Sequence, residues 1–291
     1  MAGAGTARDG RTRRGEPFAD RAQAGAALAR ALTGDPRLAD AVVLALPRGG
    51  VPVAGPVAAA LGAPLDVLVV RKLGLPGHPE LAMGALAGIA GDVVEVRNDA
   101  VLRAAGVSPA AFAEVRAAEA AELRRREAAY RGDRAARAVA GRTVLVVDDG
   151  AATGASVRAA VAALRRQGAG RVVVALPVCP PDTARLLAAE ADGLVCLREP
   201  AVFAAVGQEY RDFAATPDAE VRRVLDAARV RGVRRSGPSS SPPPPTASVS
   251  PCAASRTSPA PATRARSAWS PPGGPGGAAE PVITIMLPDE D

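Results

Sequence analysis

The segment Thr143–Gln167, TVLVVDDGAATGASVRAAVAALRRQ, is the part of the chain that decides its fold. It opens with four apolar residues, 144–147, and a short run rich in β-branched side chains is typical of a strand buried on both faces of a parallel sheet. Two carboxylates and a loop of small residues follow, and apolar residues return at helical spacing from about Ser156. The segment therefore predicts a strand, an acidic loop and a helix, in that order.

The loop of small residues, 150–156, suits a phosphate group, and we call it the phosphate loop. Gly150 and Gly154 allow close approach of the backbone and positive φ. Successive amides at a helix start form an anion cradle that the helix dipole reinforces, and Thr153 and Ser156 add hydroxyl donors. We expect a phosphate monoester to be held without a cation by the full loop, which comprises Gly150, Ala151, Ala152, Thr153, Gly154, Ala155 and Ser156.

Two carboxylates, Asp148 and Asp149, stand between the predicted strand and the phosphate loop, and we call them the acidic pair. Carboxylates at this position are suited to accepting hydrogen bonds from sugar hydroxyls. Because adjacent residues on a strand point to opposite faces, we expect one Asp to contact the ligand and the other to orient it or to hold a metal-bound water.

A second loop follows an earlier predicted strand, Val42–Leu46. In this loop Arg48 precedes Gly49 and Gly50. The pattern combines a guanidinium with close backbone approach and indicates an anion site. The alternative is a glycine turn with an exposed arginine. Ligands of parallel sheets bind beyond the carboxyl ends of the strands, so both loops are expected in one crevice. A further strand, 65–70, is predicted to end at the cations Arg71 and Lys72, again at the crevice.

The order of strand, two acids, three variable residues, Thr-Gly and Ser in 143–156 resembles the phosphoribosyl-diphosphate (PRPP) signature of type I phosphoribosyltransferases. The stretches PRGGVPVA, VVRKLG and VDDGAATGA add a resemblance, over roughly residues 16–230, to bacterial stand-alone phosphoribosyltransferases of unassigned acceptor. The alternatives are an ordinary strand-turn-helix or the acidic strand of a nucleotide hydrolase, which would need a Gly-x-x-x-x-Gly-Lys-Ser/Thr loop that the sequence lacks. The resemblance implies an α/β fold: a parallel-sheet, Rossmann-like type I phosphoribosyltransferase fold with a flexible loop.

The resemblance also implies the reaction: transfer of ribose 5-phosphate from PRPP, with Mg²⁺, to a nucleobase-like acceptor, with release of pyrophosphate. The phosphate loop would hold the 5′-phosphate, and the acidic pair would be catalytic, holding ribose hydroxyls and metal-bound waters. The residues 48–50, with Arg71 and Lys72, would hold the pyrophosphate. One residue departs from the family pattern, because Ala152 stands where enzymes acting on 6-oxopurines usually carry an Asp, and this argues against hypoxanthine or guanine as the acceptor.

Two further segments carry candidate site residues. The resemblance makes Leu73–Ala90 the flexible loop over the reaction centre, with His78 and Glu80 as proton-transfer groups; an exposed loop histidine without chemistry is the favoured alternative. Phe203 lies in an aromatic-rich late segment that in purine enzymes stacks on the base, and anchoring of the C-terminal part on the sheet explains it equally well.

The net charge of +6 is unevenly distributed. Residues 1–15 carry +3, residues 229–235 carry +4 and residues 236–291 carry −1, so the remaining body is neutral, which argues against a nucleic-acid-binding surface. Composition separates a disordered basic arm (1–15) and a disordered Pro/Ser/Gly-rich tail (233–291) from the body of the chain, and the resemblance makes this body, 16–232, a phosphoribosyltransferase domain.

The three cysteines, Cys179, Cys196 and Cys252, fit neither a metal motif nor a disulfide framework. The first two lie in apolar strand contexts and are expected to be buried and reduced. No apolar run has membrane-spanning length and no secretory signal is recognisable, so we expect no membrane partner and a cytoplasmic location.

Two other classes of function stay open from the sequence. One is a regulator that binds PRPP or a nucleotide without catalysis, and the other is a hydrolase or phosphorylase of a ribosyl phosphate. The loop at 48–50 and the predicted flexible loop favour turnover, because a pure sensor needs neither. The expected partners are PRPP and an unidentified small-molecule acceptor, with a homodimer as one option for assembly.

Overall fold

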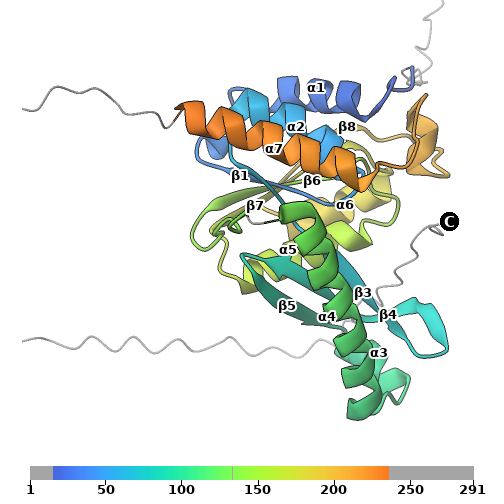
Figure 1. Cartoon of the computed structure of the whole chain (residues 1–291). Coiled ribbons are helices and arrows are strands. Elements are labelled where there is room, and N and C mark those ends of the chain that lie inside the picture. The colour runs from blue at the N-terminus through green and yellow to red at the C-terminus, as the bar shows by residue number, and fades with distance from the viewer. Residues whose placement is uncertain (1–15, 133, 236–291) are drawn as a thin grey trace, which may run out of the picture. The chain divides into compact units, whose positions relative to one another are not determined.

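Two β-sheets organise the part of the chain that the computed structural model describes, residues 16–132 and 134–235 (Figure 1). The larger sheet is parallel with strand order β2-β1-β6-β7-β8, and the smaller is antiparallel with order β3-β4-β5. The strands are β1 (Val42–Ala45), β2 (Leu65–Val67), β3 (Val70–Leu75), β4 (His78–Ile89), β5 (Asp92–Arg97), β6 (Thr143–Val147), β7 (Arg171–Val178) and β8 (Gly193–Arg198). The parallel sheet confirms the predicted α/β fold class.

Helices cover both faces of the parallel sheet (Figure 1). Two begin at side-chain caps, since Asp20 accepts from the Gln23 amide at 2.7 Å and Ser108 accepts from the Ala111 amide at 3.2 Å. The α-helices are α1 (Arg21–Leu32), α2 (Gly50–Leu61), α3 (Asp99–Ala104), α4 (Pro109–Arg131), α5 (Ala155–Arg166), α6 (Pro181–Glu190) and α7 (Asp218–Arg235), and the 3₁₀ turns are η1 (Pro36–Leu38) and η2 (Val206–Glu209).

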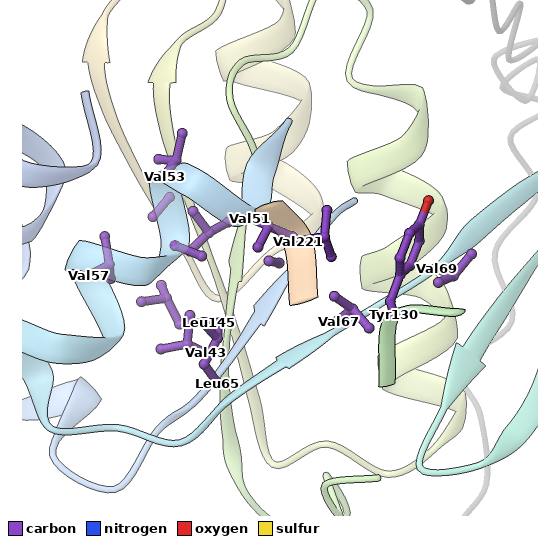
Figure 2. Packing of buried hydrophobic residues seen from close by; sticks show 14 of the residues in the cluster. Val43, Val51, Val53, Val57, Leu65, Val67, Val69, Tyr130, Leu145 and Val221 are labelled. Carbon is purple, nitrogen blue, oxygen red and sulfur yellow. The ribbon is translucent and has the colours of Figure 1, made fainter. Parts of the chain in front are cut away.

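The central strands of the parallel sheet, β1, β6 and β7, are largely apolar because both of their faces are buried. On β1, Val43 packs into the core shared with α1, α2, α4 and α7, whereas Val42 and Leu44 pack into a second core with α5 and α6. Figure 2 shows part of the first core, where Val43 and Leu145 of the sheet lie beside side chains of α2. The two cores fix the sheet between its helices, and with it the loops at the strand ends.

The segment expected to be a flexible loop, residues 73–90, forms a β-hairpin instead. The strands β3 and β4 pair, and Leu73, Met83 and Leu86 are fully buried. Gly74 allows the two strands to pack closely, because a Cβ at this position would lie 2.9 Å from the Pro79 carbonyl oxygen. Its exposed residues are Ala90 at the end and 76–80, which form the turn and the start of β4.

Two further expectations differ from the structure. The strand predicted over 65–70 divides into β2 and β3, so Arg71 and Lys72 lie in the antiparallel sheet rather than at the end of a parallel strand. The helix α3 was not predicted. Residues 122–127 of α4 are rich in glutamate and arginine. Glu122 pairs with neighbouring arginines on the solvated face of the helix, whereas Glu127 is buried against Arg131.

The predicted basic arm, the predicted tail from residue 236 and Cys252 lie outside the described residues. Within the described ranges, no helix combines the length and the hydropathy that a membrane span requires.

Candidate functional site

Two strand-end loops meet at the carboxyl edge of β1 and β6. The strands pair in register through Ala45 and Val147, and the Leu46 amide donates to the Val147 carbonyl at 2.9 Å. A Cβ at Gly50 would lie 2.7 Å from that same carbonyl oxygen and 2.9 Å from the Cα of Asp148. The loop 47–50, here called the pyrophosphate loop, thus lies directly against the acidic pair, and only glycine allows this approach.

Glycine is required at Gly49 too, because a Cβ there would overlap the carboxylate of Asp149. The peptide bond between Pro47 and Arg48 is cis. The backbone of the pyrophosphate loop therefore lies in contact with both carboxylates, as expected if the two strand-end loops share one crevice.

The Asp149 carboxylate is held by a cation from the N-terminal helix. Arg21 of α1 donates from Nε to Oδ2 of Asp149 at 2.8 Å, and both side chains are largely buried, with exposed fractions of 12% and 14%. The guanidinium lies 3.8 Å from the ring centroid of Phe213 and donates to the Ala214 carbonyl at 2.7 Å. On the backbone side, the Tyr210 hydroxyl donates to the carbonyl of Asp149 at 2.5 Å.

Burial dominates the electrostatics of the acidic pair. It raises the pKa of Asp148 well above its ordinary value, and the neighbouring charge of Asp149 raises it further. Burial also raises the pKa of Asp149, although the positive charge of Arg21 opposes the shift. Two adjacent carboxylates with a single arginine beside them leave an excess of negative charge, which a cation or several hydroxyl donors would relieve.

Hydrogen bonds with neighbouring elements fix the phosphate loop, and two of its backbone amides stay available to a ligand. The Ala151 amide donates to the Val178 carbonyl at 3.0 Å, and the Thr183 hydroxyl of α6 donates to the Ala152 carbonyl at 2.6 Å. Gly154 takes φ +72° immediately before α5, where a left-handed residue favours glycine. Among the described residues, the backbone amides of Thr153 and Gly154 have no acceptor.

The other residues that were predicted to bind pyrophosphate contact residues outside the acidic pair. Arg48 is exposed and lines a cavity of about 130 Å³ together with Tyr130 of α4 and Asp218 of α7. Arg71 pairs with Glu119 of α4 at 2.7 Å. Lys72 donates to the Glu80 carbonyl at 3.4 Å, and burial lowers its pKa.

His78 and Glu80 contact each other on the exposed hairpin, with 3.3 Å between Nδ1 and Oε1. In the described ranges, no hydrogen bond or ion pair joins either residue to the acidic pair. Phe203 is partly buried and packs against the cluster of Phe18 and Tyr210. These contacts are those of an aromatic anchor for the C-terminal segment.

Arg21 and Tyr210 were not predicted as site residues. Both lie far along the chain from Asp149, at separations of 128 and 61 residues. One signal was present in the sequence: an arginine directly after the helix cap Asp20 is unfavourable next to the positive end of the helix dipole, so it implies a carboxylate partner elsewhere.

Comparisons with known proteins indicate which family the chain resembles. A family model described as "Phosphoribosyl transferase domain" matches residues 18–208. Two proteins of Mycobacterium tuberculosis strains, both named "Putative phosphoribosyl transferase", are 49% identical over 211 residues, which is 72% of this chain and 47% of theirs. The chain thus spans about half the length of these curated relatives.

A crystal structure of a protein from Thermus thermophilus matches with a TM-score of 0.64 and 44% identity, over 72% of this chain and 97% of that chain. The match covers most of the described residues and supports the observed fold. Together with the family model, which covers both strand-end loops, it assigns the chain: the protein belongs to the phosphoribosyl transferase domain family.

Proposed function

We propose that the protein is a phosphoribosyltransferase that uses PRPP and Mg²⁺ and transfers ribose 5-phosphate to a nucleobase-like acceptor. One observation carries the proposal: Gly49 and Gly50 of the pyrophosphate loop lie against the acidic pair, next to the phosphate loop. The phosphate loop and the pyrophosphate loop both adjoin the two carboxylates. This arrangement suits a ligand that has a phosphate at one end, a diphosphate at the other and sugar hydroxyls between them.

In the reaction, the bond from ribose C1 to the pyrophosphate oxygen breaks and a bond from C1 to an acceptor nitrogen forms. Pyrophosphate leaves with the electron pair of the broken bond, and the acceptor loses a proton. The amides of Thr153 and Gly154 hold the 5′-phosphate, and the backbone at Gly49 holds the leaving group, since the Gly50 amide already donates to the Leu46 carbonyl at 3.0 Å. The chain contributes mainly positioning and electrostatics.

The acidic pair fits a divalent cation. Burial and mutual repulsion disfavour two negative charges there, so a bound cation would be stabilised by Asp148 and Asp149. In the described ranges no group of three or more His, Cys, Asp or Glu side chains is gathered for a metal, so ligand oxygens and water would complete the coordination. Mg²⁺, when bound, would stabilise the charge of the departing pyrophosphate.

Arg21 acts in this scheme as a positioning residue. It fixes the carboxylate of Asp149 through its Nε, while Tyr210 fixes the Asp149 carbonyl. The acceptor is proposed only as a class, and Ala152 speaks against 6-oxopurines. The cytoplasmic location expected from the sequence remains part of the proposal.

Pyrophosphate release tests the proposal. The full chain is incubated with PRPP and Mg²⁺ against a panel of purine, pyrimidine and pyridine bases, and the variants Asp148→Asn and Asp149→Asn are assayed beside it. Asp226→Asn is the matched control, because Asp226 is an exposed residue of α7 that pairs with Arg134. Base-dependent release that falls at least 100-fold in the site variants and stays unchanged in the control supports transfer.

Three other results would contradict the proposal. Release of pyrophosphate at the same rate without any base would indicate hydrolysis, and release by Asp148→Asn at the rate of the unchanged chain would remove the acidic pair from the chemistry. Binding of PRPP without release, with every base in the panel, would favour a regulator.

A further inference from the structure

The structure brings two thiols together that are 17 positions apart in the sequence. Cys179 follows the last residue of β7, and Cys196 lies in the neighbouring strand β8, opposite Leu176. Their sulfur atoms are 3.3 Å apart. Both were expected to be reduced and buried, and the close pair was not predicted, because strand pairing rather than sequence spacing places the two sulfurs together.

The two thiols differ in their access to solvent. Cys179 is fully buried, whereas Cys196 is partly exposed, so a small soluble reagent reaches Cys196 first. The Cys196 sulfur also contacts the carbonyl of Arg198 at 3.1 Å. The contact with Cys179 lowers the pKa of Cys196, and the same contact raises the pKa of Cys179. The accessible thiol is therefore also the one that ionises first.

We propose that Cys179 and Cys196 form a peroxide-sensitive modification site, where oxidation joins them in a reversible disulfide. The Cys196 thiolate attacks one oxygen of a peroxide and becomes a sulfenic acid, while the O–O bond breaks and hydroxide leaves. The Cys179 sulfur then attacks the sulfenic sulfur and expels its hydroxyl group, which leaves as water with the Cys179 proton. Two thiols lose two electrons, and the peroxide is reduced to two waters.

The bond requires only a short approach of the two sulfurs. A disulfide requires about 2.05 Å between the sulfurs, so they need to approach by about 1.3 Å. The strands are already tied there, since the Cys179 amide donates to the Arg198 carbonyl at 3.1 Å. With a resolving thiol in contact, a sulfenic acid on Cys196 closes to the disulfide before a second peroxide oxidises it.

The experiment uses the full chain carrying Cys252→Ser, which removes the third thiol. The protein is treated with hydrogen peroxide, free thiols are titrated before and after, and peptides are analysed by mass spectrometry without reduction. We expect a linked pair of peptides containing Cys179 and Cys196, loss of both titratable thiols and full recovery with dithiothreitol. Two thiols that stay titratable, or a bond between two copies of the chain in place of the internal one, would overturn the proposal.

Single variants separate the two roles. In Cys179→Ser, which lacks the resolving thiol, we expect Cys196 to gain two or three oxygen atoms irreversibly; in Cys196→Ser, we expect Cys179 to stay reduced. Cys179→Ala serves as a second variant where the serine substitution at this buried position prevents folding, as judged by circular dichroism. Equal oxidation of Cys179 and Cys196 when each is the only thiol of the pair would contradict the assigned order. None of these readouts depends on transferase activity.

Discussion

Arg21→Ala offers the sharpest test of the site geometry, because it removes the cation that holds the acidic pair. The change leaves Asp149 largely buried without its partner at 2.8 Å, and it also removes the contact with the Phe213 ring and the hydrogen bond to the Ala214 carbonyl. Removal of one partner from a fully buried pair costs about 3–5 kcal/mol. Since the pair retains some exposure, we expect a loss of about 3 kcal/mol of unfolding free energy, equivalent to about 6–12 °C in melting temperature.

The assay is urea unfolding followed by far-ultraviolet circular dichroism. Arg30→Ala is the matched control, because Arg30 lies on the same helix and is exposed. The double variant Arg21→Ala/Asp149→Asn should lose less than the sum of the two single variants, because an asparagine needs no counter-charge. An Arg21→Ala loss below about 0.5 kcal/mol, which is typical of surface positions, would refute the reasoning.

Three more predictions follow from the contacts of the site. Because the pKa of Asp148 is raised in the folded state, its contribution to stability is present below its unfolded pKa and is lost as pH rises through the folded pKa. Asp148→Asn should therefore stabilise the protein at neutral pH and reduce the fall in melting temperature as pH rises above about 4, the ordinary pKa of an aspartate. An unchanged pH profile would contradict this. Gly50→Ala should cost about 1–3 kcal/mol in urea unfolding, because its Cβ would press on the Val147 carbonyl, and a neutral result would show that the two loops are not in contact. Thr183→Val should weaken binding of a phosphate ligand with a loss of only about 1–2 kcal/mol of stability, since it frees the Ala152 carbonyl; equal affinity would mean that α6 does not support the phosphate loop.

The strands and their end loops could be predicted from local patterns. The apolar run at 144–147 has no polar face, so it could only be a strand buried on both sides, and the acids and glycines that follow define where the strand ends. Register between neighbouring strands then places Gly50 against Asp148 without further information. This is why the shared crevice was foreseeable.

The rest of the site depends on contacts between distant residues, which local patterns do not encode. Arg21 reaches Asp149 only because α1 packs on the sheet, and Cys179 meets Cys196 only because β7 and β8 are neighbours. The resemblance predicted a flexible loop at 73–90, and the regular strand pairing of this segment was not predicted. Gly74 allows the two strands to pack closely, and a single sequence does not distinguish this use of glycine from backbone freedom.

Calorimetric titration with PRPP, in the presence and absence of Mg²⁺, is the most direct test that the two loops and the acidic pair form one ligand site. The account predicts binding that strengthens at least tenfold with Mg²⁺ and that loses this dependence in Asp148→Asn and Asp149→Asn, while Asp226→Asn behaves as the unchanged chain. Binding of equal strength in the presence and absence of Mg²⁺, unaffected by either site substitution, would contradict it.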